Sequence, residues 1–281
     1  MGRAAVAPSL DWNGDNGRRW VENQDRLDRM LAAYGAALAR AAAPTVGDHV
    51  LDVGCGAGAT TFDMAARVGP SGRVVRLDIS APLIGRALDL AVSQGGGAVE
   101  FRLADAARAE FTPDFDRIVS RFGVMFFADP VASFANMRKA LKPGGRVVFA
   151  CWREPKANPW MIAPLQAVYR HVPKLPEMAP EDPGPFAFAS EARVSRILAE
   201  AGFRDVALEP QALSLDIAIG KGLDAAVQSA FEIGPASRAL EGHSPETREA
   251  ARQSVRDLLA QHQTGDSVTL PGSIWLVTAH A

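Results

Sequence analysis

A glycine-rich turn between an apolar strand and a helix constrains the fold of this chain more than any other feature. The predicted strand 48–53 runs directly into the turn 54–58, with the sequence GCGAG, and a helical pattern begins at its end. Glycines in such a turn bring backbone amides and a helix N-terminus close to a bound group. Asp78 ends the next predicted strand, so turn and carboxylate are expected at the carboxyl edge of adjacent parallel strands, where open α/β sheets bind ligands.

Short apolar segments alternate with helical ones on both sides of this turn, which predicts a mostly parallel sheet with helices on both faces. We expect an α/β fold with seven strands, an N-terminal helical extension and helical lid insertions. The other strands are predicted at 73–78, 98–103, 115–121, 146–152, 204–209 with an extension at 212–219, and 268–279; the helices are predicted at 15–43, 58–67, 81–93, 130–141, 160–170, 190–201, 222–233 and 245–262.

The organisation expected is one domain over residues 1–281. Residues 1–47 form the N-terminal extension and residues 48–152 the ligand-binding core. Residues 153–190 hold eight of the 19 prolines, and long irregular segments in compact domains tend to be lids or binding loops. Together with 221–263, this segment is predicted to cap the core.

Composition excludes several classes of protein. With 30 basic and 32 acidic side chains and a net charge of −2, the chain lacks the basic surplus with which proteins grip nucleic acid. No apolar run approaches the ~18 residues that span a bilayer, and the N-terminus has no signal core. Two cysteines and five scattered histidines give no metal-ligand spacing. We expect a cytoplasmic protein without metal; a homodimer is left open.

The spacing of the glycines indicates which nucleotide-like ligand binds. Dinucleotide folds use G-x-G-x-x-G, whereas the third glycine here, Gly58, comes one residue early. Asp52 lies two residues before the turn, and a carboxylate suits an ammonium group better than a pyrophosphate. An adenosyl ligand with an amino-acid tail is therefore favoured over NAD. An NAD-dependent oxidoreductase stays as the alternative enzyme, and a cofactor-binding protein without transferase activity as the alternative outside catalysis.

Asp52–Gly58 resembles the first motif of class I S-adenosylmethionine-dependent methyltransferases. Residues 103–106, 115–127 and 141–146 resemble the family's later motifs, so the expected sheet is Rossmann-like. The wider pattern resembles a bacterial subgroup near the ubiquinone/menaquinone-biosynthesis type methyltransferases, on residues 12–14, 20–22, 151–153, 158–160 and 184–188. The resemblance implies S-adenosyl-L-methionine as cofactor and S-adenosyl-L-homocysteine as product.

The resemblance also implies which residues bind the cofactor. Asp78 corresponds to the acidic residue that holds the ribose hydroxyls, and Asp105 with Ala106 to the segment that contacts adenine. The full predicted set is Asp52, Gly54, Cys55, Gly56, Gly58, Thr60, Asp78, Ile79, Asp105, Ala106, Arg121 and Phe122.

The methyl acceptor is less constrained. A small molecule is expected, methylated on oxygen, nitrogen, sulfur or carbon, with a quinone-like or other aromatic carbon as the specific alternative. No general base stands out, and in-line transfer can be driven by alignment and exclusion of water. We predict a pocket closed by the N-terminal helix, by 153–190 and by 222–262, with the candidate acceptor-binding residues Trp12, Trp20, Met125, Phe126, Trp152 and Trp160.

Overall fold

The sheet of the computed structural model, which describes residues 11–93, 99–179 and 181–281, has the predicted mostly parallel arrangement. Seven strands follow the order β3-β2-β1-β4-β5-β8-β6, and β7 pairs with β8 beside this path. β1 to β5 are parallel, whereas β8 runs antiparallel to both β5 and β6. The strands are β1 His49–Val53, β2 Arg73–Asp78, β3 Val99–Leu103, β4 Phe115–Arg121, β5 Leu141–Trp152, β6 Arg204–Asp216, β7 Gln263–Thr264 and β8 Ser267–His280.

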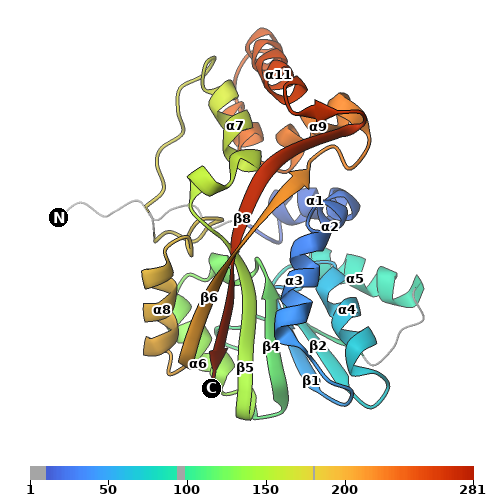
Figure 1. The fold of residues 1–281 in the computed structure, drawn as a ribbon, viewed down its shortest axis with the longest axis vertical. Helices are drawn as coiled ribbons and strands as arrows, with labels where there is room; N and C mark the ends of the chain where they lie inside the picture. The colour runs from blue at the N-terminus through green and yellow to red at the C-terminus, as the bar shows by residue number, and fades with distance from the viewer. Residues whose placement is uncertain (1–10, 94–98, 180) are drawn as a thin grey trace, which may run out of the picture.

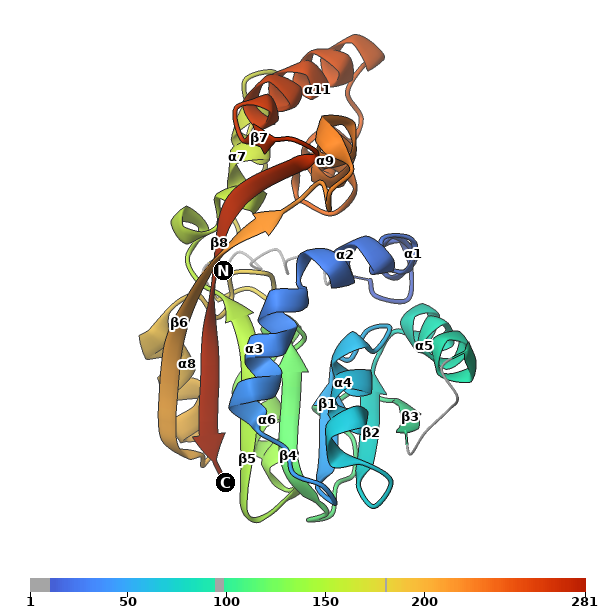
Figure 2. The same ribbon diagram turned by 45° about the vertical axis from the view of Figure 1, so that its right-hand side comes forward.

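Helices cover both faces of this sheet (Figures 1 and 2). Alternating strand residues supply the two cores: Val50, Val74 and Val119 pack with α3 and α4, while Leu51 and Ile118 belong to the core on the α6 and α8 side. The helices are α1 Asp15–Glu22, α2 Gln24–Met30, α3 Ala32–Ala42, α4 Ala59–Val68, α5 Ala81–Ser93, α6 Pro130–Arg138, α7 Pro159–Val168, α8 Glu191–Glu200, α9 Gly222–Glu232, α10 Ala236–Ala239 and α11 Pro245–Ala260, with short 3-10 turns at Val124–Phe126 and Pro155–Ala157.

The N-terminal region differs from the single helix predicted over 15–43. It forms three helices, separated at Asn23 and Leu31, whose backbones lie near φ −100°, ψ 5° and φ −97°, ψ 5°. The two breaks change the direction of the chain, so that α3 packs on the sheet while α1 and α2 lie above the strand ends (Figure 2). Helical periodicity did not reveal the breaks because apolar residues continue at helical spacing through both of them.

The two C-terminal strands are longer than predicted. β6 is continuous where the sequence indicated two pieces, because Pro210 is accommodated at the outer edge of the sheet, where only one side needs ladder hydrogen bonds. β6 and β8 extend past the end of β5 as a two-stranded ribbon, and α7, α9, α10 and α11 gather around its far end (Figure 1). We call these four helices the cap. The short elements α10 and β7 were not predicted.

β5 also begins earlier than predicted. Its bounds include residues 141–145, which precede the predicted strand 146–152, and the pairing with β4 shifts register between Phe115 and Arg117. Of the helices that the structure describes, none has the length and apolar character needed to cross a bilayer.

Candidate cofactor and acceptor site

A cavity of about 560 Å³ lies at the carboxyl ends of β1 to β5. Because these five strands are parallel and adjacent, residues far apart in the sequence meet along this edge. Sixteen of the eighteen residues predicted for the site line the cavity: Gly54, Cys55, Gly56, Thr60, Asp78, Ile79, Asp105, Ala106, Arg121 and Phe122 from the cofactor set, and Trp12, Trp20, Met125, Phe126, Trp152 and Trp160 from the acceptor set.

The glycine turn after β1 forms the floor of this cavity through its backbone. Gly54 has φ +65°, and a Cβ placed on it would lie 2.7 Å from the Cα of Gly123, so the loops after β1 and β4 touch backbone to backbone. Gly56 has φ +55°, and a Cβ there would have no protein atom within 4 Å. The turn therefore presents bare backbone to open space, as a cradle for a ligand requires.

Asp78 joins the turn to the end of β2. Its Oδ2 accepts a hydrogen bond from the Gly56 amide at 2.9 Å, and its Oδ1 accepts one from the Ser80 amide at 2.9 Å. Burial raises the pKa of this carboxyl, while the amide donors and the nearby Arg76 act in the opposite direction. Each carboxylate oxygen keeps a free lone pair, so the side chain can still accept hydrogen bonds from a ligand's hydroxyl groups.

The segment after β3 provides the next part of the wall. Asp105 accepts the Ala107 amide at 2.9 Å and thereby shapes a tight turn, and Asp105 and Ala106 both line the cavity. Ile79, between β2 and α5, is 45% exposed, an unusual state for a large apolar side chain beside a cavity. An adenine ring is a flat, apolar group of the kind that would cover it.

Asp52 and Gly58 are not among the residues that line the cavity, so the cofactor contact expected of them stays a prediction. Asp52 is fully buried and accepts the Thr61 hydroxyl at 2.5 Å. Burial raises its pKa to about 6, an effect that Thr61, Arg76 and Arg121 reduce. Successive residues of a strand face opposite sides, so Val53 reaches the cavity whereas Asp52 lies on the side of α4.

Gly58 is explained by Arg76, which sequence reasoning missed. A Cβ on Gly58 would lie 0.9 Å from Nη2 of Arg76, so the missing side chain makes room for a guanidinium rather than for a ligand. Arg76 is fully buried, with its Cζ 4.8 Å from the ring centre of Phe62 and 4.6 Å from that of Phe101. The sequence sign that could have revealed this role is that Arg76 interrupts the apolar residues of β2.

An aromatic wall closes the end of the cavity at β4 and β5. Phe122 and Trp152 stack with ring centres 4.3 Å apart and planes 8° from parallel, and Trp160 lies 5.2 Å from Trp152. Phe122 has φ +68°, which is strained for a bulky residue and turns its ring onto Trp152. The buried Tyr34 meets both rings of the stack edge-on from α3. We refer to Phe122, Trp152 and Trp160 as the aromatic wall.

The N-terminal segment is fastened across the opposite rim. The Asn13 side chain donates to the Ile79 carbonyl at 3.0 Å and accepts from the Ala81 amide at 2.9 Å. The Trp12 ring meets Trp20 at 5.7 Å and Phe126 at 5.1 Å, both edge-to-face. Trp12 thus bridges from the β2 side of the cavity to the β4 side.

A polar chain from α2 to β4 was also missed. The Gln24 amide donates to Asp28 at 2.5 Å, and Arg121 donates to the other oxygen of Asp28 at 2.6 Å. Gln24 and Arg121 line the cavity, and Oε1 of Gln24 is buried without a partner among the described residues. The sequence did not indicate this arrangement, because Gln24 and Asp28 look like ordinary polar residues of a surface helix.

The predicted lid segments also reach the cavity. Trp160 and Met161 come from the start of α7, Pro185 from the loop before α8, and Ile233 from the end of α9. The acceptor end is therefore assembled from α7, the proline-rich loop and one residue of the cap's C-terminal part, in addition to α1 and α2.

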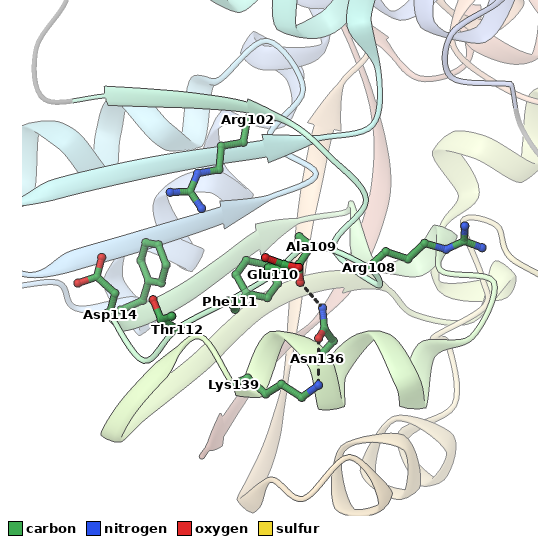
Figure 3. A pocket seen from close by; sticks show the side chains of 10 residues that line it. Arg102, Arg108, Ala109, Glu110, Phe111, Thr112, Asp114, Asn136 and Lys139 are labelled. Atoms are coloured by element: carbon green, nitrogen blue, oxygen red, sulfur yellow. Dashed lines mark hydrogen bonds between the residues drawn. The ribbon is translucent and has the colours of Figure 1, made fainter.

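A second cavity, of about 610 Å³, lies between the segment after β3 and helix α6 (Figure 3). Several of its polar groups are already paired: Asn136 donates to the Ala109 carbonyl at 2.9 Å and accepts from Lys139 at 3.3 Å. Arg102 pairs with Glu100 at 2.7 Å, and Asp114 with Arg73 at 2.8 Å. This cavity lies away from the glycine turn and the aromatic residues that line the first cavity.

Among the residues that the structure describes, no group of three or more His, Cys, Asp or Glu side chains is arranged so that it could hold a metal ion. No histidine lines the strand-end cavity. His171 instead contacts Ser254 at 2.7 Å, and His49 contacts Asp114 at 3.1 Å.

The residues present fit an adenosyl cofactor of the kind that the sequence resemblance implies. The open space above Gly56 is where bare backbone can meet the ligand, and Asp78 and Asp105 place carboxylates at the ends of neighbouring strands. The same edge then continues into apolar, aromatic surface at β4 and β5, which gives the site a polar end and an apolar end.

Comparison with known proteins indicates the family to which this chain belongs. Residues 44–202 match the family model described as a methyltransferase domain. The chain is 30% identical over 281 residues to nocamycin O-methyltransferase of Saccharothrix syringae, covering 90% of this chain and 95% of the relative. It is 30% identical over 178 residues to the ubiquinone/menaquinone biosynthesis C-methyltransferase UbiE of Coxiella burnetii, covering 57% and 68%.

Among solved structures, Haemonchus contortus phosphoethanolamine N-methyltransferase 2 in complex with S-adenosyl-L-methionine aligns with a TM-score of 0.58 at 16% identity. The alignment covers 100% of this chain and 61% of that one, and at this identity it shows a shared fold. The family model matches more than half of the chain, and nocamycin O-methyltransferase aligns with it along nearly its whole length. Together with the strand-end cavity, these matches show that the chain belongs to the methyltransferase-domain family and is an S-adenosyl-L-methionine-dependent methyltransferase.

Proposed function

We propose that this methyltransferase methylates an oxygen atom of a flat, largely apolar small molecule. The observation that carries the proposal is the aromatic wall, a stacked Phe122–Trp152 pair continued by Trp160, which lines the cavity beyond the glycine turn. Flat rings of this kind favour planar apolar ligands. The relative aligned over 90% of this chain is an O-methyltransferase, which supports oxygen as the methylated atom.

The strand order suggests how the two ligands share the cavity. Asp105 and Ala106 after β3 would hold adenine, Asp78 at the end of β2 would hold the ribose, and the turn Gly54–Gly56 after β1 would hold the amino-acid part. Bound S-adenosyl-L-methionine supplies an activated methyl group on a positively charged sulfonium. The next strand ends in the order, β4 and β5, carry the aromatic wall and are left for the acceptor.

The protein's contribution to catalysis is then alignment and exclusion of water. Trp12, Trp20 and Phe126 would cover one rim, and the cap and proline-rich loop the other. The carboxylates among the described lining residues, Asp78, Asp105 and Asp129, each accept a backbone amide within their own loop. We propose that they shape the cavity and that the acceptor binds as its oxyanion, having already lost its proton to solvent. The methyl group then passes from the sulfonium to this oxygen without proton removal by a side chain.

Methylation of a quinone-like carbon is the second candidate. The relative UbiE is a C-methyltransferase, and an aromatic wall accepts a quinone as readily as a phenol. That relative aligns with 57% of this chain, less than the O-methyltransferase does, so oxygen is the preferred atom.

The test is methyl transfer from cofactor carrying a ¹³C-labelled methyl group to a panel of phenols, enols, aromatic carboxylic acids and quinones. We expect one equivalent of S-adenosyl-L-homocysteine per labelled product, with the methyl carbon at the chemical shift of an O-methyl group. A C-methyl shift would replace the proposal by the second candidate. Tight cofactor binding with no transfer to any acceptor would favour a protein that keeps the site without the reaction.

We also propose that residues 1–281 act as one unit, with residues 153–190 and 221–263 as lid elements over a small-molecule acceptor. Amide hydrogen exchange tests this. S-adenosyl-L-homocysteine should protect residues 12–30 and at least one lid segment, in addition to the turn and strand ends. Protection confined to 52–61, 78–80 and 105–106 would show that the lid segments do not respond to the cofactor. NAD should produce no protection.

A further inference from the structure

Arg76 is the least expected charge in the molecule. It is fully buried on β2, and Nε, Nη1 and Nη2 have no hydrogen-bond partner among the described residues. A buried guanidinium without partners is costly, so its surroundings must compensate for the lost hydration. Two of them do so by contact: the rings of Phe62 and Phe101 lie on the guanidinium at 4.8 Å and 4.6 Å.

The remaining compensation comes from the residues that form the cofactor end of the cavity. Arg76 is the direct strand neighbour of Asp52 in the β1–β2 ladder, and it lies beside the Cys55 thiol. Asp78 follows it by two residues on the same strand, which places both side chains on one face. Nη2 reaches the space that a Cβ on Gly58 would occupy. The guanidinium thus lies beside the glycine turn, close enough to the buried carboxyls of Asp52 and Asp78 to lower the pKa of each.

We propose that Arg76 is a positioning residue for the cofactor, whose buried charge keeps the Asp78 carboxylate ionised and so keeps the ribose-binding end of the cavity competent at neutral and mildly acidic pH. The proposal goes beyond the acceptor chemistry above and depends only on cofactor binding. Arg76 does not line the cavity and acts through Asp78.

The electrostatic surroundings of Asp78 support this role. Burial raises the pKa of its carboxyl, the amides of Ser80, Gly56 and Ile79 lower it, and Arg76 is the charged group that lowers it further. Asp52 on β1 is near enough to interact electrostatically with Asp78, and Asp105 lines the cavity beyond β3; when ionised, both carry the same sign of charge as Asp78. The Cys55 thiol stays protonated, because burial raises its pKa well above the usual value. Without Arg76, only the backbone amides would stabilise the ionised form of Asp78.

The experiment compares the wild type with Arg76→Met, Arg76→Lys and Arg73→Met. Methionine fills the space between the two phenylalanine rings without charge, and lysine keeps the charge. Arg73 lies at the other end of β2, where it pairs with Glu100 and Asp114, so Arg73→Met is a matched loss of charge on the same strand. The dissociation constant of S-adenosyl-L-homocysteine is measured by calorimetry at several pH values between 5.5 and 8.5.

We expect all four proteins to bind alike at pH 8.5. At pH 5.5, Arg76→Met should bind about tenfold more weakly than the wild type, because only the fraction with ionised Asp78 is competent. Arg76→Lys and Arg73→Met should follow the wild type. A loss of the same size at every pH would show a merely structural role and overturn the proposal, as would unchanged binding throughout.

Two further measurements keep the proposal testable if Arg76→Met does not fold. Arg76→Gln should show the same pH-dependent loss, and a ¹³C NMR titration of the wild type and this variant reports the Asp78 carboxyl directly. The variant must raise its midpoint; an unchanged midpoint overturns the proposal. In an Asp78→Asn background, replacing Arg76 should add no further pH dependence. If replacing Arg76 still caused a pH-dependent loss of binding in the Asp78→Asn protein, the titrating group would be Asp52 and the proposal would be overturned.

Discussion

The cofactor end and the acceptor end of the cavity are built in different ways. At the cofactor end, backbone groups of short loops are fixed by carboxylates, as where Asp78 holds the amides of Gly56 and Ser80. At the acceptor end, side chains from distant segments pack together, as where Trp152 meets Phe122 and Trp160. The first kind of wall tolerates few substitutions, whereas the second can change shape while remaining apolar.

The largest effect is expected at Gly56. Gly56→Val should abolish measurable binding of S-adenosyl-L-homocysteine, because a branched side chain would fill the open cradle and strain a backbone at φ +55°. Calorimetry on the folded variant is the measurement. Gly144→Val is the matched control, since Gly144 also has positive φ and open space around its Cβ but lies outside the cavity. Normal cofactor binding by Gly56→Val would show that the glycine turn does not contact the cofactor.

A smaller loss should follow from Asp78→Ala. Hydrogen bonds to a carboxylate contribute about 1.5–3 kcal/mol, so the affinity for S-adenosyl-L-homocysteine should fall by roughly 10–100-fold. Part of this loss is indirect, because the Gly56 amide also loses its acceptor. Repeating the titration with a 2′,3′-dideoxy analogue separates the two parts: the mutation should matter less for a ligand that lacks the ribose hydroxyls. Equal losses for both ligands would mean that Asp78 only shapes the turn.

The acceptor end should respond to Trp160→Leu. Losing an aromatic contact of about 0.5–1.5 kcal/mol should raise the acceptor KM by roughly 2–10-fold and leave cofactor affinity unchanged. Steady-state kinetics with an acceptor identified in the transfer screen, beside calorimetry of S-adenosyl-L-homocysteine, gives both quantities for one variant. A comparable loss of cofactor affinity would show that the two ends are not separate.

The smallest effect concerns stability beneath the turn. Because burial raises the pKa of Asp52 to about 6, its stabilising contribution is present below the ordinary carboxyl range and is lost as pH rises through about 6. Asp52→Asn has no such titration, so its free energy of unfolding relative to the wild type should rise by roughly 1–3 kcal/mol between pH 4 and 7.5. Urea denaturation at several pH values measures this, with the surface variant Asp63→Asn as control. Parallel curves for Asp52→Asn and wild type would contradict the assignment.

The same contrast explains what could be predicted from the sequence. The sheet, the glycine turn, Asp78 and Asp105 follow from short local patterns, because strand alternation and strand-end loops place those groups without reference to the rest of the chain. Arg76, the Gln24–Asp28–Arg121 chain and the breaks at Asn23 and Leu31 depend on contacts between distant segments. A motif gives residue order but not which face of β1 a side chain occupies, so the sequence did not show that Asp52 lies on the side of α4, where it accepts the Thr61 hydroxyl.

The ribbon formed by the outer parts of β6 and β8 has a consequence for how such an enzyme can diversify. The ladder continues from Ala212–Ser273 to Asp216–Thr269, beyond the last pair that β8 makes with β5 at Trp152–Ile274. The cap is therefore mounted on two strands that contribute nothing to the glycine turn or to the ends of β2 and β3. Insertions, deletions or exchange of cap helices along this ribbon would present new acceptor surfaces to an unaltered methyl donor site. Because the cap supplies Trp160 and Met161 from α7 and Ile233 from the end of α9, changes in these helices would alter the acceptor end while the cofactor end stays as it is.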